Sequence, residues 1–120
     1  MRLRIGLTAI AAVTLTAAML TSGALSAGGP DQRTGDKLLG ACEAEKGEAT
    51  SWCRAYLIGA ADMLYMIGTG GHSTGICGAA YTPEILEDAY ISWMEEHPAM
   101  ENVDMAVGAS LAFRNRWPCE

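Results

Sequence analysis

The apolar residues of this chain fall into one unbroken run near the N-terminus and four later segments with helical spacing. Residues 5–20 carry no charge, follow Arg2 and Arg4, and give way to the small residues of 21–27. A charged start, an apolar middle and a small-residue end are typical of a secretory signal peptide. The run is also shorter than the roughly 20 residues of a membrane-spanning helix, the alternative interpretation. We therefore expect cleavage of residues 1–27, after which no segment inserts into a membrane.

The next two segments predict a pair of helices joined by a short turn. Residues 28–34 form a flexible lead-in. A first helix is predicted over 35–45, with apolar residues at helical spacing, and Gly47 ends it. Thr50 or Ser51 caps the second helix, which the glycines after Ile67 end. Its predicted buried face consists of Trp52, Tyr56, Gly59, Ala60, Met63 and Ile67, which recur at three- and four-residue steps.

Three polar or special positions on these helices carry further expectations. Glycine inside a helix costs about 1 kcal/mol relative to alanine, so Gly59 predicts that another helix or a bulky ring crosses closely there. Asp62 is either an exposed carboxylate or one bonded to a neighbouring helix or to Arg54. The methionines are predicted to fill gaps in a small core, with these falling largely on core faces: Met63, Met66, Met94, Met100 and Met105.

Two more helices are predicted in the C-terminal half. Thr82-Pro83-Glu84 starts the third, because Thr caps, Pro suits the first turn and Glu favours the positive helix end. This helix stops at His97, before Pro98. The fourth is predicted from Pro98 to about Asn115. The predicted apolar faces are Ile85, Leu86, Ala89, Trp93 and Met94 on the third helix, and Met100, Val103, Val107, Ser110 and Leu111 on the fourth.

No segment alternates apolar and polar residues over the length of a strand. The sequence therefore predicts an all-α domain over 35–120, a compact bundle of about four antiparallel helices joined by short loops. Two disulfides are expected to hold it, because four cysteines in a short exported chain are typical of a disulfide framework. A zinc site would need closely spaced cysteine pairs, which the chain does not have.

Four cysteines allow three pairings. Cys42 and Cys53 lie almost symmetrically about the turn at 47–48, so their side chains are predicted to meet across the helical hairpin. That pairing leaves Cys77 with Cys119, which would tie the long loop of 68–81 to the C-terminus.

Charge and motif content argue against an enzyme or a nucleic-acid binder. Cleavage after residue 27 leaves six basic and fourteen acidic residues, a net charge of −8. Such a surface repels nucleic acid and favours a basic partner, or simply keeps the protein soluble. The cysteines are better explained as bridges than as nucleophiles, and Glu95, Glu96 and His97 occupy a helix end where charge is usually solvated. We expect no catalytic residue, no metal and no cofactor.

Several motifs together resemble a known family. They are Gly35-Asp36-Lys37-Leu38-Leu39 before Cys42, then Cys53-x-x-Tyr56-x-x-Gly59-x-x-Asp62, Cys77 before Thr82, His97-Pro98, and Trp117-Pro118-Cys119. Over about residues 35–119 the chain resembles the type VI amidase immunity (Tai-type) family of small periplasmic proteins. The resemblance implies a helical, disulfide-bonded protein, often a homodimer, that blocks the active-site cleft of a secreted peptidoglycan amidase. The matching positions are framework residues: the four cysteines, Tyr56, Gly59, Asp62 and Pro118.

The sequence thus predicts a periplasmic immunity protein whose partner is a cell-wall amidase effector. Two exposed segments are the predicted partner contacts. One is the loop at His72, Ser73 and Thr74, and the other is the acidic turn at Glu95, Glu96, His97 and Glu101. The alternative function is a periplasmic stress chaperone, or a structural envelope module, without a toxin partner.

Overall fold

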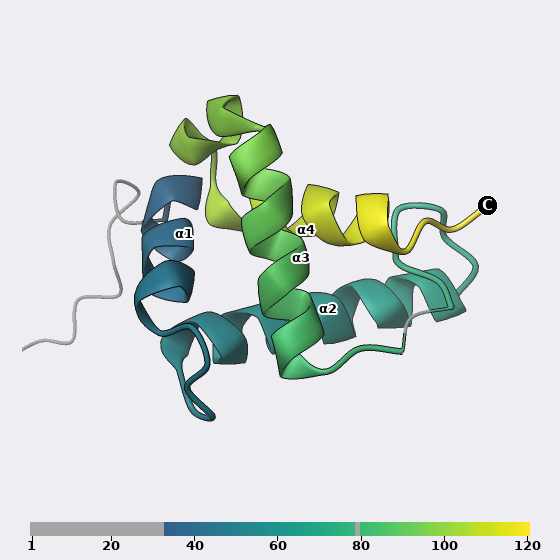
Figure 1. Cartoon of the computed structure of the whole chain (residues 1–120). Helices are drawn as coiled ribbons and strands as arrows, with labels where there is room; N and C mark the ends of the chain where they lie inside the picture. The colour runs from purple at the N-terminus through teal and green to yellow at the C-terminus, as the bar shows by residue number, and fades with distance from the viewer. Residues whose placement is uncertain (1–32, 79) are drawn as a thin grey trace, which may run out of the picture.

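A computed structural model describes residues 33–78 and 80–120 of the chain (Figure 1). The predicted signal peptide and all but the last two residues of the lead-in lie outside the described residues. Within these ranges the structure contains helices and no strand, which confirms the all-α prediction. None of the described helices meets the length and apolarity needed to cross a membrane. The elements are α1 (Gly35–Ala44), α2 (Trp52–Thr69), α3 (Pro83–Glu96), the 3-10 helix η2 (Pro98–Asn102) and α4 (Met105–Arg116).

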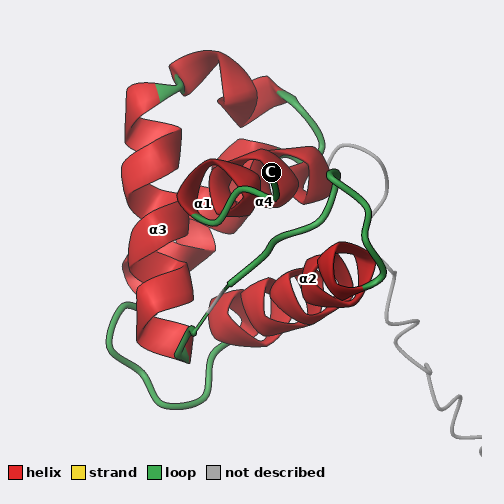
Figure 2. Cartoon of the chain, turned by 90° about the vertical axis from the view of Figure 1, so that its right-hand side faces the viewer, coloured by secondary structure: helices red, strands yellow, loops and turns green. Residues whose placement is uncertain are grey.

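Each of the four α-helices packs against the other three, and α3 makes the most extensive contacts, with α2 and with α4. It crosses both α2 and α4, which lie on the same side of it (Figures 1 and 2). The starts of α2 and α3 agree with the sequence prediction. The Ser51 hydroxyl accepts a hydrogen bond from the Arg54 amide at 3.0 Å, and the Thr82 hydroxyl accepts one from the Ile85 amide at 3.4 Å. Each cap satisfies an amide that has no partner inside its helix.

The prediction that the fourth helix begins at Pro98 is wrong. A short 3-10 helix begins at Pro98, the chain then becomes extended at Val103, and α4 begins only after Asp104. The Asp104 carboxylate caps α4 by accepting from the Ala106 amide at 2.8 Å. The break is held by backbone bonds to the start of α1 and the residues before it, since the Val103 carbonyl accepts from the Gly35 amide at 2.8 Å and the Arg33 carbonyl accepts from the Met105 amide at 2.7 Å.

The buried face predicted for α2 is also wrong. Trp52 is 48% exposed and Met63 is 60% exposed, while the opposite side of the helix is buried. The prediction about Gly59 fails as well, because a Cβ built there would have no atom of the chain within 4 Å. The residues that α2 does bury are Cys53, Arg54, Leu57, Ala61, Leu64 and Gly68.

Helices α3 and α4 bury partly different residues from those expected. On α3, Ile85 is exposed, whereas Tyr90, which was not predicted to lie in the core, is fully buried. On α4, Val107 is exposed, and the buried face consists of Met105, Gly108, Ala109, Ala112 and Phe113. The methionine prediction holds for Met94 and Met105, which are buried, and fails for Met63 and Met66, which are exposed.

Both predicted disulfides are present. Cys42 at the end of α1 is bonded to Cys53 at the start of α2, across the turn where Gly47 has a φ of +86°. Cys77 is bonded to Cys119 and so fixes the loop after α2 to the C-terminal segment. The described residues contain no free cysteine.

Candidate functional site

The loop between α2 and α3 is held tightly against the end of α2. The Ile76 amide donates to the Leu64 carbonyl at 3.0 Å, and the Ile76 side chain is fully buried. Two glycines make this approach possible. A Cβ on Gly68 would lie 2.0 Å from the Ile76 carbonyl oxygen, and one on Gly75 would lie 2.1 Å from the Gly68 nitrogen. Any larger residue would therefore push the loop off the helix.

The tip of this loop carries the first set of predicted contact residues. The side chains of His72, Ser73 and Thr74 are all exposed. The backbone below them is closed into a turn, because the His72 carbonyl accepts from the Gly75 amide at 3.1 Å and the His72 amide donates to the Ile67 carbonyl at 3.2 Å. The tip thus combines a fixed backbone with side chains that face solvent.

The far end of the loop is attached to α2 through Asp62. This carboxylate accepts a hydrogen bond of 2.7 Å from the Tyr81 hydroxyl, which settles the alternatives left open for Asp62. It lies on the exposed surface and bonds to the loop, not to Arg54. Burial, followed by the hydrogen bond to Asp62, raises the pKa of Tyr81 to about 12. The Tyr81 ring also packs at a tilt against Trp117, with 5.9 Å between ring centroids.

The other framework residues predicted from the resemblance have different surroundings. Tyr56 is half-buried and its ring stacks on Trp52 with 5.9 Å between centroids. Burial, followed by the charge of Asp104, raises the pKa of the Tyr56 hydroxyl. Gly59 faces open space on α2, and Pro118 is exposed beside the disulfide-bonded Cys119.

The acidic turn at the end of α3 carries the second set of predicted contact residues. Glu95, Glu96 and Glu101 are exposed, and none of them has an ion-pair partner among the described residues. His97 is also exposed but oriented, because its Nδ1 lies 2.7 Å from the Trp93 carbonyl oxygen and its ring stacks on the Trp93 indole at 4.1 Å. This turn presents uncompensated negative charge.

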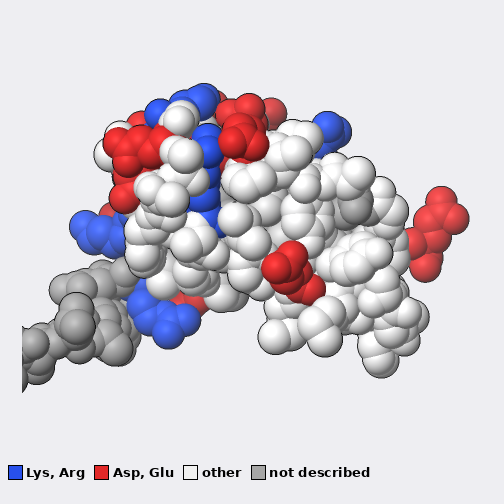
Figure 3. Space-filling model, turned by 90° about the horizontal axis from the view of Figure 1, so that it is seen from below, with Lys and Arg blue, Asp and Glu red and all other residues white. Residues whose placement is uncertain are grey.

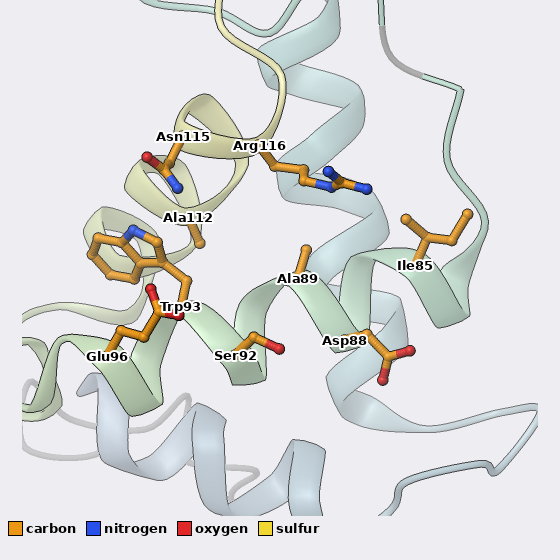
Figure 4. Close-up of a pocket in the computed structure, with 9 residues that line it drawn as sticks. All are labelled: Ile85, Asp88, Ala89, Ser92, Trp93, Glu96, Ala112, Asn115 and Arg116. Atoms are coloured by element: carbon orange, nitrogen blue, oxygen red, sulfur yellow. The ribbon is translucent and has the colours of Figure 1, made fainter.

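A groove of about 420 Å³ lies beside the acidic turn, between α3 and α4 (Figure 4). Glu96 of α3 and Asn115 and Arg116 of α4 line it (Figure 4). Asp88 also lines it, but its carboxylate points away from α4 and pairs with Lys46 at 3.4 Å. No group of three or more potential metal ligands occurs in the part of the chain that the structure describes. This groove was not predictable from the sequence, because it depends on how the two helices cross. The remaining lining residues are Ile85, Ala89, Ser92, Trp93 and Ala112.

The two predicted contact segments do not form one continuous site. The acidic turn and η2 lie at the upper end of α3 in Figure 1, whereas the loop of 70–78 lies at the far end of α2. A partner that touches both must span the molecule, or else each segment contacts a different region or a different partner.

A third surface, which the sequence assigned to the core, is the outward face of α2. Trp52, Met63 and Met66 are exposed large apolar residues on this helix, and Gly59 lies between them. The side of the molecule on which α2 lies is largely uncharged: most of its charged residues gather toward one end, and an acidic residue interrupts the uncharged area (Figure 3). An exposed apolar surface of this kind is typical of an interaction site.

Comparison with known proteins places the chain in a family. The sequence model of the Rap1a immunity proteins matches residues 34–119, nearly all of the described domain, so the chain belongs to this family. These are immunity proteins against effectors of type VI secretion systems, and they act by binding a secreted toxin and are typically non-enzymatic. The match confirms the prediction of an immunity protein. Searches of curated proteins and of solved structures gave no match.

Proposed function

We propose that this protein is a periplasmic immunity protein that binds a type VI secreted peptidoglycan amidase and occludes its active-site cleft. Membership of the Rap1a immunity proteins supports a secreted effector as the partner, and immunity proteins of this kind are typically periplasmic. The resemblance to the Tai-type family supports an amidase as that effector. The predicted signal peptide over residues 1–27 supports export.

The observation that carries the occlusion mechanism is the anchored loop with its exposed tip. Cys77 ties one side of the loop to Cys119, and the bond between Ile76 and Leu64 ties it to α2. Ordering a flexible loop on binding costs affinity, so a loop that is already ordered binds more tightly. A protruding, rigid segment with three polar side chains, at His72, Ser73 and Thr74, suits insertion into a polar catalytic cleft.

The acidic turn supplies a second proposed contact. Glu95, Glu96, His97 and Glu101 present negative charge without internal partners, and the domain as a whole is acidic. Electrostatic attraction of this kind accelerates the encounter with a basic surface and selects among partners. We expect the region of the amidase around its cleft entrance to be basic.

The proposed active form is a homodimer, each copy of which presents one loop. The exposed apolar face of α2 supports association. The alternative of a stress chaperone is not favoured, because the family match supports one dedicated effector and not a range of unfolded clients.

The test begins with a pull-down from periplasmic and secreted fractions of the producing cells, using the processed, oxidised protein as bait. The recovered hydrolase is then assayed on purified peptidoglycan with increasing amounts of the immunity protein. We expect stoichiometric inhibition. Recovery of many unrelated unfolded proteins, or of no cell-wall amidase, would contradict the proposal.

A pair of loop variants tests the proposed mechanism. The triple change His72→Ala, Ser73→Ala and Thr74→Ala should weaken inhibition at least about tenfold, equivalent to about 1.4 kcal/mol of binding free energy. The matched control changes Glu48→Ala and Thr50→Ala in the other exposed loop, between α1 and α2, and should inhibit like the unaltered protein. Equal inhibition by both variants would exclude the loop as the occluding element.

A further inference from the structure

The groove between α3 and α4 carries opposite charges at its two ends. Glu96 of α3 lines one end beside Trp93, whereas the guanidinium of Arg116 extends from α4 over the other end, toward Ile85 (Figure 4). Neither charged group has an ion-pair partner among residues 33–78 and 80–120. Both charges are therefore available to a ligand that enters the groove.

The groups around Arg116 do not neutralise it. Asp88 lines the same end of the groove, but its carboxylate points away from α4 and lies 3.4 Å from the Nζ atom of Lys46. The Arg116 guanidinium carbon lies 6.0 Å from the centre of the Trp117 ring. This cation–π contact attracts the guanidinium without supplying a hydrogen-bond acceptor or a negative charge in the plane of its N–H groups.

The lining between the charged ends is small and apolar. Ala89 of α3 and Ala112 of α4 each present only a methyl group to the groove, and Trp93 lies beside them. The Trp93 ring is only 9% exposed and stacks on His97 with 4.1 Å between ring centroids, so its position is fixed. A lining of this kind suits short apolar side chains.

Two neutral polar side chains complete the lining. Ser92 on α3 offers a hydroxyl group and Asn115 on α4 offers an amide, and both residues are exposed. Hydroxyl and amide groups both donate and accept hydrogen bonds, as the peptide groups of a ligand require. A few polar groups around an apolar lining are typical of a small-ligand site, and such sites have volumes from about 300 Å³ upward.

The dimensions of the groove set the length of this ligand. Glu96 lies seven residues after Ala89 and eleven residues after Ile85 on the same helix. At 1.5 Å per residue, the charged ends are therefore about 10–16 Å apart. An extended peptide covers about 3.3 Å per residue, so about three to five residues bridge this separation.

We propose that this groove binds a short free peptide, about three to five residues long, with small apolar side chains. The amino end of the peptide pairs with Glu96. Its carboxylate pairs with Arg116 and accepts a hydrogen bond from Asn115. The occupant carries both charges, because a purely cationic ligand would be repelled by Arg116 and a purely anionic ligand by Glu96.

This site adds a ligand to the proposed function without depending on it. A peptidoglycan amidase is one source of such peptides, since hydrolysis of an amide bond leaves a free amine on the released peptide. The peptide site is tested with no effector present. Failure of the test would therefore leave the immunity function standing, and failure of amidase inhibition would leave the peptide site standing.

A nuclear magnetic resonance titration of the isotope-labelled, processed protein with tetra-alanine tests the site. Because exposed ion pairs are weak, we expect a dissociation constant on the order of 1 mM. The chemical shifts should change most at the indole N–H of Trp93 and at the side-chain amide of Asn115. Affinity should rise from dialanine to tetra-alanine or penta-alanine and then level off.

Blocked peptides test the two charged ends on the unaltered protein. Acetylating the amino end of tetra-alanine, or amidating its carboxyl end, should each weaken binding about threefold, because each removes one ion pair. Blocking both ends should weaken it further. Equal binding of the free and the doubly blocked peptide would overturn the proposal, as would the absence of any shift in the groove at millimolar tetra-alanine.

Charge-neutralising variants assign each end to its residue. Glu96→Gln should lose the preference for a free amino end and keep the preference for a free carboxylate, and Arg116→Gln should do the reverse. The matched controls Glu95→Gln and Arg114→Gln, at neighbouring charges that do not line the groove, should keep both preferences. Loss of a preference in a control, or its survival in both groove variants, would overturn the assignment. Circular dichroism checks that each variant is folded.

Discussion

Arg54 of α2 and Glu87 of α3 form an ion pair that is almost entirely buried. The two residues are 6% and 2% exposed, and both Nε and Nη2 of Arg54 donate to the same oxygen of Glu87, at 3.2 and 3.1 Å. The third donor of Arg54, Nη1, lies 2.9 Å from the exposed carboxylate of Glu84. Since these contacts join the two helices that cover much of the core, the pair fixes how α2 lies against α3.

Removing one member of this pair should destabilise the fold strongly. Glu87→Ala leaves the buried Arg54 charge with only the exposed Glu84 carboxylate as a partner, which should cost about 3 kcal/mol of the free energy of unfolding. Glu84→Ala removes only an exposed partner and should cost less than about 1 kcal/mol. Urea denaturation measures both. The double change Arg54→Met and Glu87→Leu should recover most of the lost stability. If Glu87→Ala costs no more than Glu84→Ala, the Arg54–Glu87 pair does not stabilise the packing of α2 against α3.

The two disulfides should contribute unequally to stability. The bonded cysteines are separated by 11 residues for Cys42–Cys53 and by 42 residues for Cys77–Cys119. In the chain-entropy account, loops of these lengths give about 3 and about 4 kcal/mol. Replacing each pair by alanine and measuring chemical denaturation checks the order.

Effector binding distinguishes the two bridges further. Loss of Cys77–Cys119 frees the proposed contact loop, so affinity for the amidase should fall more than after loss of Cys42–Cys53. The reverse order in affinity would argue against a contact role for that loop.

Two groups of glycines should respond to alanine in opposite directions. At Gly68 and Gly75 a Cβ would collide with backbone atoms at 2.0 and 2.1 Å, so alanine should destabilise the protein and loosen the loop. At Gly59 the space is open, and alanine should stabilise the folded monomer by about 1 kcal/mol through helix propensity. Thermal unfolding at low protein concentration measures the monomer, and destabilisation by Gly59→Ala there would contradict the open position.

Tyr81 should make the protein less stable at alkaline pH. Its pKa is raised to about 12 in the folded chain by burial and then by Asp62, while an unfolded tyrosine titrates near 10. The folded state therefore retains a proton that the unfolded state loses, so this contribution to stability is complete below pH 10 and is lost as the pH rises to about 12.

Denaturation series at several pH values measure this effect. Tyr81→Phe should reduce the alkaline decline without abolishing it, because the raised pKa values of Tyr56 and Tyr90 act in the same direction. Asp62→Asn should reduce it less than Tyr81→Phe, since burial is the larger cause. An unchanged alkaline decline in Tyr81→Phe would contradict the assignment.

The sequence predicted the helices well where local chemistry marks their ends. Ser51, Thr82 and Gly47 act through their own side chain or backbone, so their roles are visible without tertiary structure. The cysteine pairing was likewise predictable, because Cys42 and Cys53 flank one turn. The break at Asp104 was not, since it depends on backbone bonds to residues about 70 positions earlier in the chain.

The orientation of α2 shows the limit of periodicity. Its apolar residues occur on both faces, so their spacing identified a helix without identifying the buried side. By apolar character and spacing alone, Leu57 and Leu64 were as suitable for the core as Tyr56 and Met63. The choice depends on Cys53 facing Cys42 and on Arg54 facing Glu87, which are contacts between helices. Part of the face predicted to be core is consequently exposed, at Trp52 and Met63.

The division of the contact loop into a fixed base and a free tip has a consequence for how such a protein diverges. Gly68, Gly75 and Cys77 tolerate almost no substitution, because each is bound to the neighbouring backbone or to Cys119. The three residues at the tip make no side-chain hydrogen bond within the described chain. The tip residues can therefore be substituted one at a time during evolution without unfolding the protein. In the proposed function, the tip can therefore change with the effector while the base of the loop stays constant.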